Sequence, residues 1–268
     1  MTTIQTTFRV GMSALALACL AGCVSMDEGV PVVMPPGGAP AQPAKRVVTL
    51  ISPDLTLLNL RNQDLTALPA GVTGLPRLSE IYLDGNPRIV LGEDFARLRS
   101  LKRLSLQGCG LERVPDIVCR VGSLEVLSLD DNLLTGLPTD LGKLGALRVL
   151  TLDRNQVRVL PETIGSLPAL QIFNLDNNLI EELPVTIGGL TALKTLSLAG
   201  NRITRLPDSV CGLAALESLD LRNNRLTRMP EEVGRLAALK VLTVTGNLLT
   251  RTEIQRIRRL LPHTMVVE

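Results

Sequence analysis

The chain repeats itself every 23 residues, and this periodicity limits the folds that it can adopt. A leucine occupies the first position of each repeat, and a proline stands at position fifteen of most of them. The leucines are Leu55, Leu78, Leu101, Leu124, Leu147, Leu170, Leu193, Leu216 and Leu239. The prolines are Pro69, Pro115, Pro138, Pro161, Pro184, Pro207 and Pro230. One short repeat cannot bury its leucines alone, so the repeats are expected to stack around one continuous core.

Each repeat contains a strand pattern followed by an asparagine, as in "LEVLSLDDNLLTGLPTDLGKLGA" from residue 124. The alternation in its first half predicts a short strand with one buried face. The asparagine follows where the chain turns, and its amide can both donate to and accept from backbone groups that sheet pairing leaves free. Cys109 takes this place in the third repeat. The predicted asparagine ladder consists of Asn86, Asn132, Asn155, Asn178, Asn201, Asn224 and Asn247.

The pattern LxxLxLxxNxLxxLPxxIGxL resembles the leucine-rich repeat family, whose repeats run about 20–29 residues. The resemblance covers residues 55 to about 261. It implies an α/β fold: a horseshoe-shaped solenoid of about nine repeats, with a parallel sheet on its concave side and short helical or 3₁₀ segments on its convex side. The family accepts cysteine at the asparagine position. The second repeat departs from the pattern in its outer segment, because Gly92 stands where the proline is expected.

Both ends of a solenoid need caps. Thr250 and Glu253 fit a capping box at the start of a last helix. The apolar face of that helix is predicted to contain Ile254, Ile257, Leu260 and Leu261, with Pro262 ending it. Residues 265–267 are a candidate last strand, and residues 47–51 are the expected cap at the other end.

Residues 1–22 are predicted to be a lipoprotein signal peptide. A polar start that carries Arg9 precedes an apolar run from Val10 to Leu20. This is the order of a secretory signal, and the run is shorter than the ~20 residues that span a bilayer. Leu20-Ala21-Gly22-Cys23 resembles the lipobox of bacterial lipoproteins, which implies cleavage before Cys23 and acylation of that residue. An ordinary secretory signal, cut nearby and released, is the alternative.

The lipobox resemblance also implies a location. Val24, rather than the aspartate that retains lipoproteins at the inner membrane, follows the cysteine, so the outer membrane is expected. Residues 23–46 then contain the lipidated cysteine and a linker rich in Pro, Gly and Ala. Residues 47–268 form the repeat domain with its caps. We expect a monomer.

Composition excludes several functions. A net charge of +2 is no nucleic-acid footprint, and with no Trp, one Tyr and three Phe the chain lacks stacking platforms for bases. The five cysteines have no zinc spacing and no disulfide framework; Cys119 and Cys211 are predicted to be free and buried. We find no catalytic constellation, no metal-ligand cluster and no cofactor motif. His263, the one histidine, is expected at an exposed tip.

The concave face is where the family usually meets ligands. Its candidate partner-binding residues occupy repeat positions three, five and seven: Tyr82, Asp84, Val126, Ser128, Asp130, Val149, Thr151, Asp153, Ile172, Asn174 and Asp176. The three position-three residues Val126, Val149 and Ile172 are expected to form a small apolar row. The position-seven aspartates form an acidic stripe beside it. Two interpretations are possible. In the preferred one the aspartates cap their own turns, and in the other they bind a cation or a basic partner.

Arginines recur near the C-terminal end of the repeats. They are Arg202, Arg205, Arg225, Arg228, Arg251, Arg256, Arg258 and Arg259. The predicted function is a membrane-anchored interaction module that binds a protein on its concave face. The alternative is an envelope-structural protein whose basic edge binds lipopolysaccharide or peptidoglycan.

Overall fold

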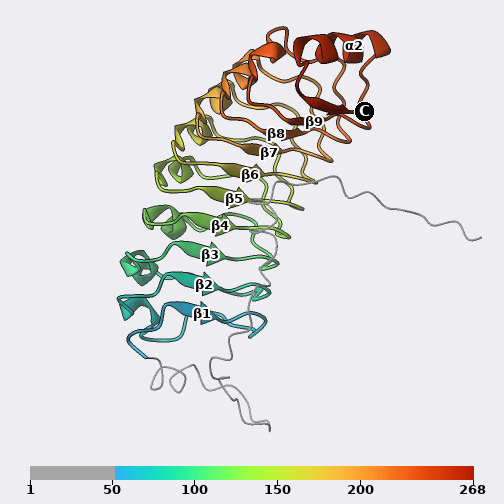
Figure 1. Cartoon of the computed structure of the whole chain (residues 1–268). Helices are drawn as coiled ribbons and strands as arrows, with labels where there is room; N and C mark the ends of the chain where they lie inside the picture. The colour runs from blue at the N-terminus through green and yellow to red at the C-terminus, as the bar shows by residue number, and fades with distance from the viewer. Residues whose placement is uncertain (1–51) are drawn as a thin grey trace, which may run out of the picture. The chain divides into compact units, whose positions relative to one another are not determined.

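The computed structural model describes residues 52–268, which lie in one compact unit of the chain, Ala44–Glu268. Ten parallel strands form one sheet in the order of the sequence, β1 to β10 (Figure 1). The strands are β1 Leu57–Asn59, β2 Glu80–Tyr82, β3 Arg103–Ser105, β4 Val126–Ser128, β5 Val149–Thr151, β6 Ile172–Asn174, β7 Thr195–Ser197, β8 Ser218–Asp220, β9 Val241–Thr243 and β10 Met265–Val267. The predicted solenoid of the leucine-rich repeat type is therefore confirmed.

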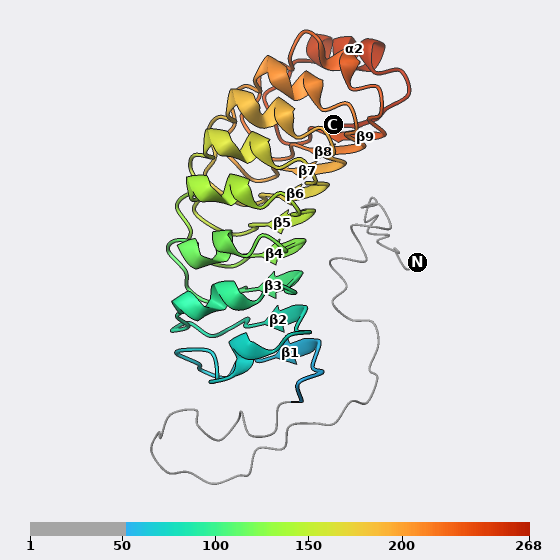
Figure 2. The same cartoon turned by 90° about the vertical axis from the view of Figure 1, so that its left-hand side faces the viewer.

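Short 3₁₀ helices are stacked on the side opposite the sheet (Figure 2). They are η2 Val72–Gly74, η3 Glu93–Arg97, η4 Asp116–Arg120, η5 Thr139–Lys143, η6 Glu162–Ser166, η7 Val185–Gly189, η8 Asp208–Gly212 and η9 Val233–Arg235. A single α-helix among the described residues, α2 Arg251–Leu260, follows the last repeat. The sheet lies on the inner side of a gentle curve, so its solvent-facing side is the concave face.

Strand register follows the repeat without a slip. Val126 pairs with Val149 and Val149 with Ile172, each one 23-residue repeat further along the chain. The middle residue of each of these strands points inward, and Leu127 and Leu150 are both 0% exposed. Full burial of such a side chain contributes about 1.5–3 kcal/mol relative to leaving it exposed. Because every repeat adds leucines at the same positions, they join in one continuous core.

Proline and glycine shape the outer side. A proline in extended conformation precedes η4 to η8, where its fixed φ suits the residue before a helical turn. A Cβ at Gly165 would collide with the carbonyl oxygen of Thr186 in the next repeat, so the outer segments can stack closely only with glycine there. Gly92 replaces the proline before η3, yet η3 forms with the same five-residue length because Gly92 adopts the same extended conformation. The departure in the second repeat therefore does not change the fold.

The C-terminal cap forms with two differences from the prediction. Thr250 accepts the Glu253 N–H at 3.2 Å, but the Glu253 carboxylate accepts the N–H of Met229 instead of completing the capping box. It thereby ties the cap to the last repeat. Leu260 is 38% exposed and does not join Ile254, Ile257 and Leu261 in the core, because it lies at the end of the helix. The predicted last strand is β10, whereas the expected cap at residues 47–51 lies outside the described residues.

Candidate functional site

The predicted concave residues lie on one face of adjacent strands. Ser128, Thr151 and Asn174 are aligned across β4, β5 and β6, and the three apolar side chains are aligned beside them. The expected apolar row is nevertheless a poor contact surface, because Val149 and Ile172 are only 7% and 5% exposed. Equivalent side chains on parallel strands stand about 4.8 Å apart and cover each other's flanks. Val149 and Ile172 therefore offer little surface to a partner, whereas Val126 is partly exposed.

The asparagine ladder is confirmed by its hydrogen bonds. Asn155 Nδ2 donates to the carbonyl oxygens of Leu129 and Leu152 at 2.9 and 3.0 Å, and Oδ1 accepts the N–H of Leu134 at 3.0 Å. The other six asparagines make the same kinds of bonds. Cys109 reproduces only part of the pattern, with its thiol 3.3 Å from the Leu83 carbonyl oxygen. The ladder is structural, because it satisfies backbone groups between repeats and points away from the concave surface.

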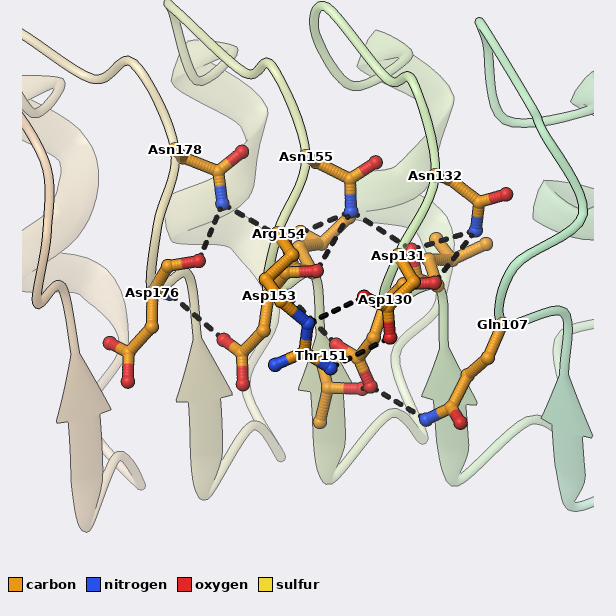
Figure 3. Close-up of polar contacts among 12 residues, drawn as sticks. Gln107, Asp130, Asp131, Asn132, Thr151, Asp153, Arg154, Asn155, Asp176 and Asn178 are labelled. Atoms are coloured by element: carbon orange, nitrogen blue, oxygen red, sulfur yellow. Dashed lines mark hydrogen bonds and ion pairs between the residues drawn. The ribbon is translucent and has the colours of Figure 1, made fainter.

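The acidic stripe makes a second ladder (Figure 3). Asp130 accepts the backbone N–H of Asp153 at 2.7 Å, Asp153 accepts that of Asp176 at 2.8 Å, and Asp176 accepts that of Ala199 at 2.8 Å. Asp84 does the same with Gln107 at 3.0 Å. The prediction that each aspartate caps its own turn is therefore wrong: each one bonds the next repeat. Position seven lies just past the strand, where the side chain supplies the acceptor that sheet pairing no longer provides.

Side chains at repeat position five donate further hydrogen bonds to most of these aspartates. The hydroxyl of Thr151 donates to Asp130 at 2.7 Å, and that of Ser197 donates to Asp176 at 2.6 Å. Gln107 also donates to Asp130, at 2.7 Å. These hydrogen bonds between repeats could have been predicted from the sequence, because a Ser or Thr at position five pairs with an aspartate at position seven of the preceding repeat. Asp153 breaks this rule, because the residue in that place is Asn174.

Burial perturbs the carboxyl groups of the stripe. Burial raises the pKa of Asp130 and of Asp176 above the ordinary value for aspartate. The pKa of Asp153 is raised to about 7, first by burial and then by the negative charges of Asp176 and Asp130. Asp131, one residue past Asp130, differs: Arg154 forms two hydrogen bonds with it at 2.5 and 2.7 Å and lowers its pKa. Arg154 also acts on Asp130 and Asp153, and Arg222 acts on Asp176, so nearby arginines offset part of the negative charge of the stripe.

A second polar cluster surrounds Tyr82, near the N-terminal end of the described sheet. The guanidinium of Arg61 lies 4.2 Å from the ring centroid and its Nε lies 2.5 Å from Asp84. The Tyr82 hydroxyl donates to Glu80 at 2.7 Å, and Arg103 lies 3.5 Å from the same carboxylate. Tyr82 and Asp84 were predicted from the sequence, but their three charged partners were not, although Arg61 stands at repeat position seven and Glu80 and Arg103 stand at position three. These contacts hold the aromatic ring in one orientation on the concave face.

The basic edge is less available than its sequence suggests. Arg205, Arg228, Arg256 and Arg258 each form an ion pair with a glutamate. Arg256 is the most tightly held, because it also donates to the carbonyl oxygen of Met229 at 2.8 Å. These pairs reduce the positive charge that this edge can offer to an anionic polymer.

The remaining predicted features fall away from the concave site. Cys109, Cys119 and Cys211 are free and buried, as expected for the last two, and burial raises the pKa of each thiol. His263 is exposed beyond α2. Within residues 52–268, no three His, Cys, Asp or Glu side chains are grouped closely enough to hold a metal ion. No helix in this part of the chain is long and apolar enough to cross a bilayer. Cys23 lies outside the described residues.

Comparison with known proteins agrees with this geometry. The family described as leucine rich repeat matches residues 99–157, 122–180, 157–203 and 191–249. No curated protein matches the chain. Among solved structures, a leucine-rich repeat protein of Leptospira interrogans is 36% identical with a TM-score of 0.74, and the match covers 81% of this chain and 55% of that one. The chain thus spans about half the length of that protein.

Two more distant structures share the fold alone. An internalin from Listeria monocytogenes is 19% identical with a TM-score of 0.64, over 73% of this chain and 55% of the internalin. A plant peptide hormone receptor, solved in complex with RGF2, is 23% identical with a TM-score of 0.58, over 79% of this chain and 33% of the receptor. The 23-residue repeat, the parallel sheet with its asparagine ladder and the family match agree, and the chain belongs to the leucine-rich repeat family.

Proposed function

We propose that the chain is a protein-binding module that a lipid on Cys23 holds at the outer membrane of a bacterium. The observation that carries the binding role is the ordered polar surface of the concave face. Tyr82 is fixed by Arg61 and Glu80, and the aspartates are fixed by hydrogen bonds between repeats. A surface that is already ordered loses little conformational entropy when a partner binds.

Known relatives support a protein partner by analogy. The plant receptor of the same fold was solved in complex with RGF2. That receptor is only 23% identical, so its likeness establishes the fold alone. It supports a protein or peptide ligand for this chain by analogy, and it does not identify that ligand. We infer that the partner contacts the accessible residues of the face, which include Tyr82 and Ser128, and not the buried Val149 and Ile172.

Site-specific photo-crosslinking in intact cells tests the binding role. The probe belongs at Ser128, which is half-buried, because Thr151 in the same row is only 8% exposed and its hydroxyl holds Asp130. A matched control probe belongs at Ser166, which is exposed on the convex side. A discrete protein adduct from Ser128 alone supports the proposal. Adducts of equal yield from both positions, or from neither, contradict it.

Metabolic labelling with an alkyne fatty acid tests the anchor. The proposal rests on the lipobox-like Leu20-Ala21-Gly22-Cys23 and on the short apolar run before it. Three acyl chains on Cys23 would hold the protein stably, since two or more membrane signals suffice. Label should be absent from Cys23→Ala, and that variant should leave the membrane fraction. Label retained by Cys23→Ala refutes the anchor and leaves the binding role untouched.

The alternative is an envelope-structural role for the basic edge. Arg202, Arg225, Arg251 and Arg259 form no ion pair within residues 52–268, so some positive charge remains free there. Binding of peptidoglycan or lipopolysaccharide by these arginines should collapse as salt is added. Retention on purified peptidoglycan that is lost between 50 and 500 mM NaCl, with no Ser128 adduct in cells, would favour this alternative.

A further inference from the structure

A basic flank lies beside the concave face on the seventh, eighth and ninth repeats. It comprises repeat positions ten to thirteen, which follow the asparagine of each repeat: residues 202–205, 225–228 and 248–251. The first two segments read Arg-x-Thr-Arg, and the third reads Leu-Leu-Thr-Arg. No aspartate or glutamate occurs in these segments. The flank therefore repeats positive side chains at the same positions of adjacent repeats.

The segments of the flank run side by side with their polar side chains towards solvent. Ile203 and Leu226 are 0% exposed, and the arginine and threonine on either side of each are half-buried or exposed. The Arg225 N–H donates to the Ile203 carbonyl oxygen at 2.9 Å, and the Leu248 N–H donates to that of Leu226 at 2.9 Å. Segments joined in this way lie about 4.8 Å apart. Equivalent side chains of adjacent repeats are therefore close neighbours.

The charge of the flank is only partly neutralised. Arg205 pairs with Glu182 and Arg228 with Glu231, and the exposed Glu181 borders the flank on the sixth repeat. Three arginines of the flank have no carboxylate partner within residues 52–268: Arg202, Arg225 and Arg251. Like charges on neighbouring segments repel each other. An anionic ligand on the flank would remove this repulsion.

The side chains of the flank match the phosphate groups of a lipid surface. A guanidinium presents a planar fork of N–H donors that can bind two oxygens of one phosphate. Thr204 and Thr227 place exposed hydroxyl donors beside the arginines. Leu248, which is 64% exposed, continues the row of Arg225. Basic and apolar side chains together are typical of surfaces that lie in the membrane interface, whereas a polar polymer offers no apolar layer to a leucine.

The chain is long enough to bring this flank to the membrane that holds the proposed anchor. Cys23 lies 29 residues before Ser52, so the intervening chain can span at most about 100 Å. The nine repeats extend over only about 40 Å. Positions ten to thirteen lie past the ends of the strands, so contact there leaves the concave face open to a partner.

We propose that the basic flank binds the phosphate groups of anionic phospholipids and thereby sets how the anchored solenoid lies on the membrane. The inference rests on the lipid anchor of the proposed function and is independent of the identity of the protein partner. Each arginine near an anionic surface strengthens binding roughly fivefold, so the three arginines without a carboxylate partner contribute about a hundredfold.

Binding to vesicles tests the flank without the anchor. The full-length Cys23→Ala chain is mixed with vesicles of phosphatidylcholine, with or without phosphatidylglycerol, and the bound protein is separated by flotation. It should prefer the vesicles that contain phosphatidylglycerol. Addition of Arg202→Gln and Arg225→Gln should weaken this binding about 20-fold. Thermal unfolding checks that the variant is folded.

The matched control is the pair Arg97→Gln and Arg99→Gln in the same Cys23→Ala chain. It removes the same charge from exposed arginines at η3, far along the solenoid from the flank. Binding should stay close to that of the parent chain. Equal losses in the two double variants would mean that net charge alone matters and would overturn the inference, as would equal binding to both kinds of vesicle. Retention on purified peptidoglycan without vesicle binding would assign the arginines to the envelope polymer instead.

A photo-reactive probe in intact cells locates the contact. Benzoylphenylalanine replaces Leu248, and radioactive phosphate labels phospholipid headgroups but not the acyl chains of the anchor. A labelled adduct with the mass of a phospholipid should form from this position, and none should form from a probe at Ser166 on the convex side. Adducts from both positions or from neither contradict the inference, and so does an adduct with lipopolysaccharide.

The inference and the proposed function fail separately. If Cys23 carries no acyl label, the anchor is refuted, while vesicle binding by the Cys23→Ala chain still reports on the flank. If Arg202→Gln and Arg225→Gln leave vesicle binding unchanged, the flank is refuted, while the acyl label on Cys23 and the Ser128 adduct remain.

Discussion

The asparagine ladder permits a quantitative test of how the repeats hold together, through Asn155→Ala. Removal of the amide breaks the bonds to two carbonyl oxygens and one N–H. The carbonyls of Leu129 and Leu152 each keep a second partner, from the amides of Asn132 and Asn178. The N–H of Leu134 keeps none, and Leu134 is 0% exposed.

These contacts set the expected loss of stability. An orphaned buried N–H costs about 1–3 kcal/mol, and each of the other two bonds contributes about 1 kcal/mol net. Asn155→Ala should therefore lower the free energy of unfolding by roughly 3–5 kcal/mol. Urea denaturation of the repeat domain, followed by far-UV circular dichroism, measures this difference.

The matched control is Asn247→Ala, at the C-terminal end of the same ladder. Asn247 makes the same kinds of bonds, to Leu221, Val244 and Leu226. It is only half-buried, so water can replace its amide, and the loss should be about half that of Asn155→Ala. A loss below about 1 kcal/mol for Asn155→Ala, or equal losses for both variants, would refute the reasoning from burial.

Three further predictions follow from other positions. Cys109→Asn should raise the free energy of unfolding by about 1 kcal/mol. An asparagine amide at this position can also accept the N–H of Arg88, which has no hydrogen-bond partner within residues 52–268. An unchanged urea midpoint would contradict this prediction. The raised pKa of Asp153 means that the folded chain holds this proton more tightly than the unfolded chain, so stability should fall as pH rises from about 4 to about 7. Melting temperatures across this range should show a shallower fall in Asp153→Asn, and parallel curves for the variant and the wild type would argue against the assignment. Burial raises the pKa of Cys119 to about 11, so its reaction with iodoacetamide at pH 8 should proceed only as the chain unfolds; rapid alkylation of the native protein would be the contrary result.

Much of the fold could be predicted from the sequence because each repeat carries the same local instructions. Leucine at fixed positions predicts the buried face of every strand, and asparagine at position nine predicts the inter-repeat bonds. A regular period also fixes the register, since a slip of one residue would expose the leucines. Gly92 is informative here: it departs from the pattern, but the stacked neighbours still impose the outer segment. The lipobox remains a prediction from sequence, because it lies outside the described residues.

The character of the concave surface was decided only by the tertiary structure. Their repeat positions were enough to predict that Val149, Ile172 and Asn174 lie on the concave face. Their burial could not be predicted in this way, because it depends on side chains 23 residues away on each side. For the same reason the aspartates appeared to serve their own turns, whereas each bonds the following repeat. By itself the sequence determined a stacked solenoid, because leucine periodicity acts within each repeat. Which side chains are satisfied, and which still require a partner, depended on contacts between repeats that exist only after the chain has folded.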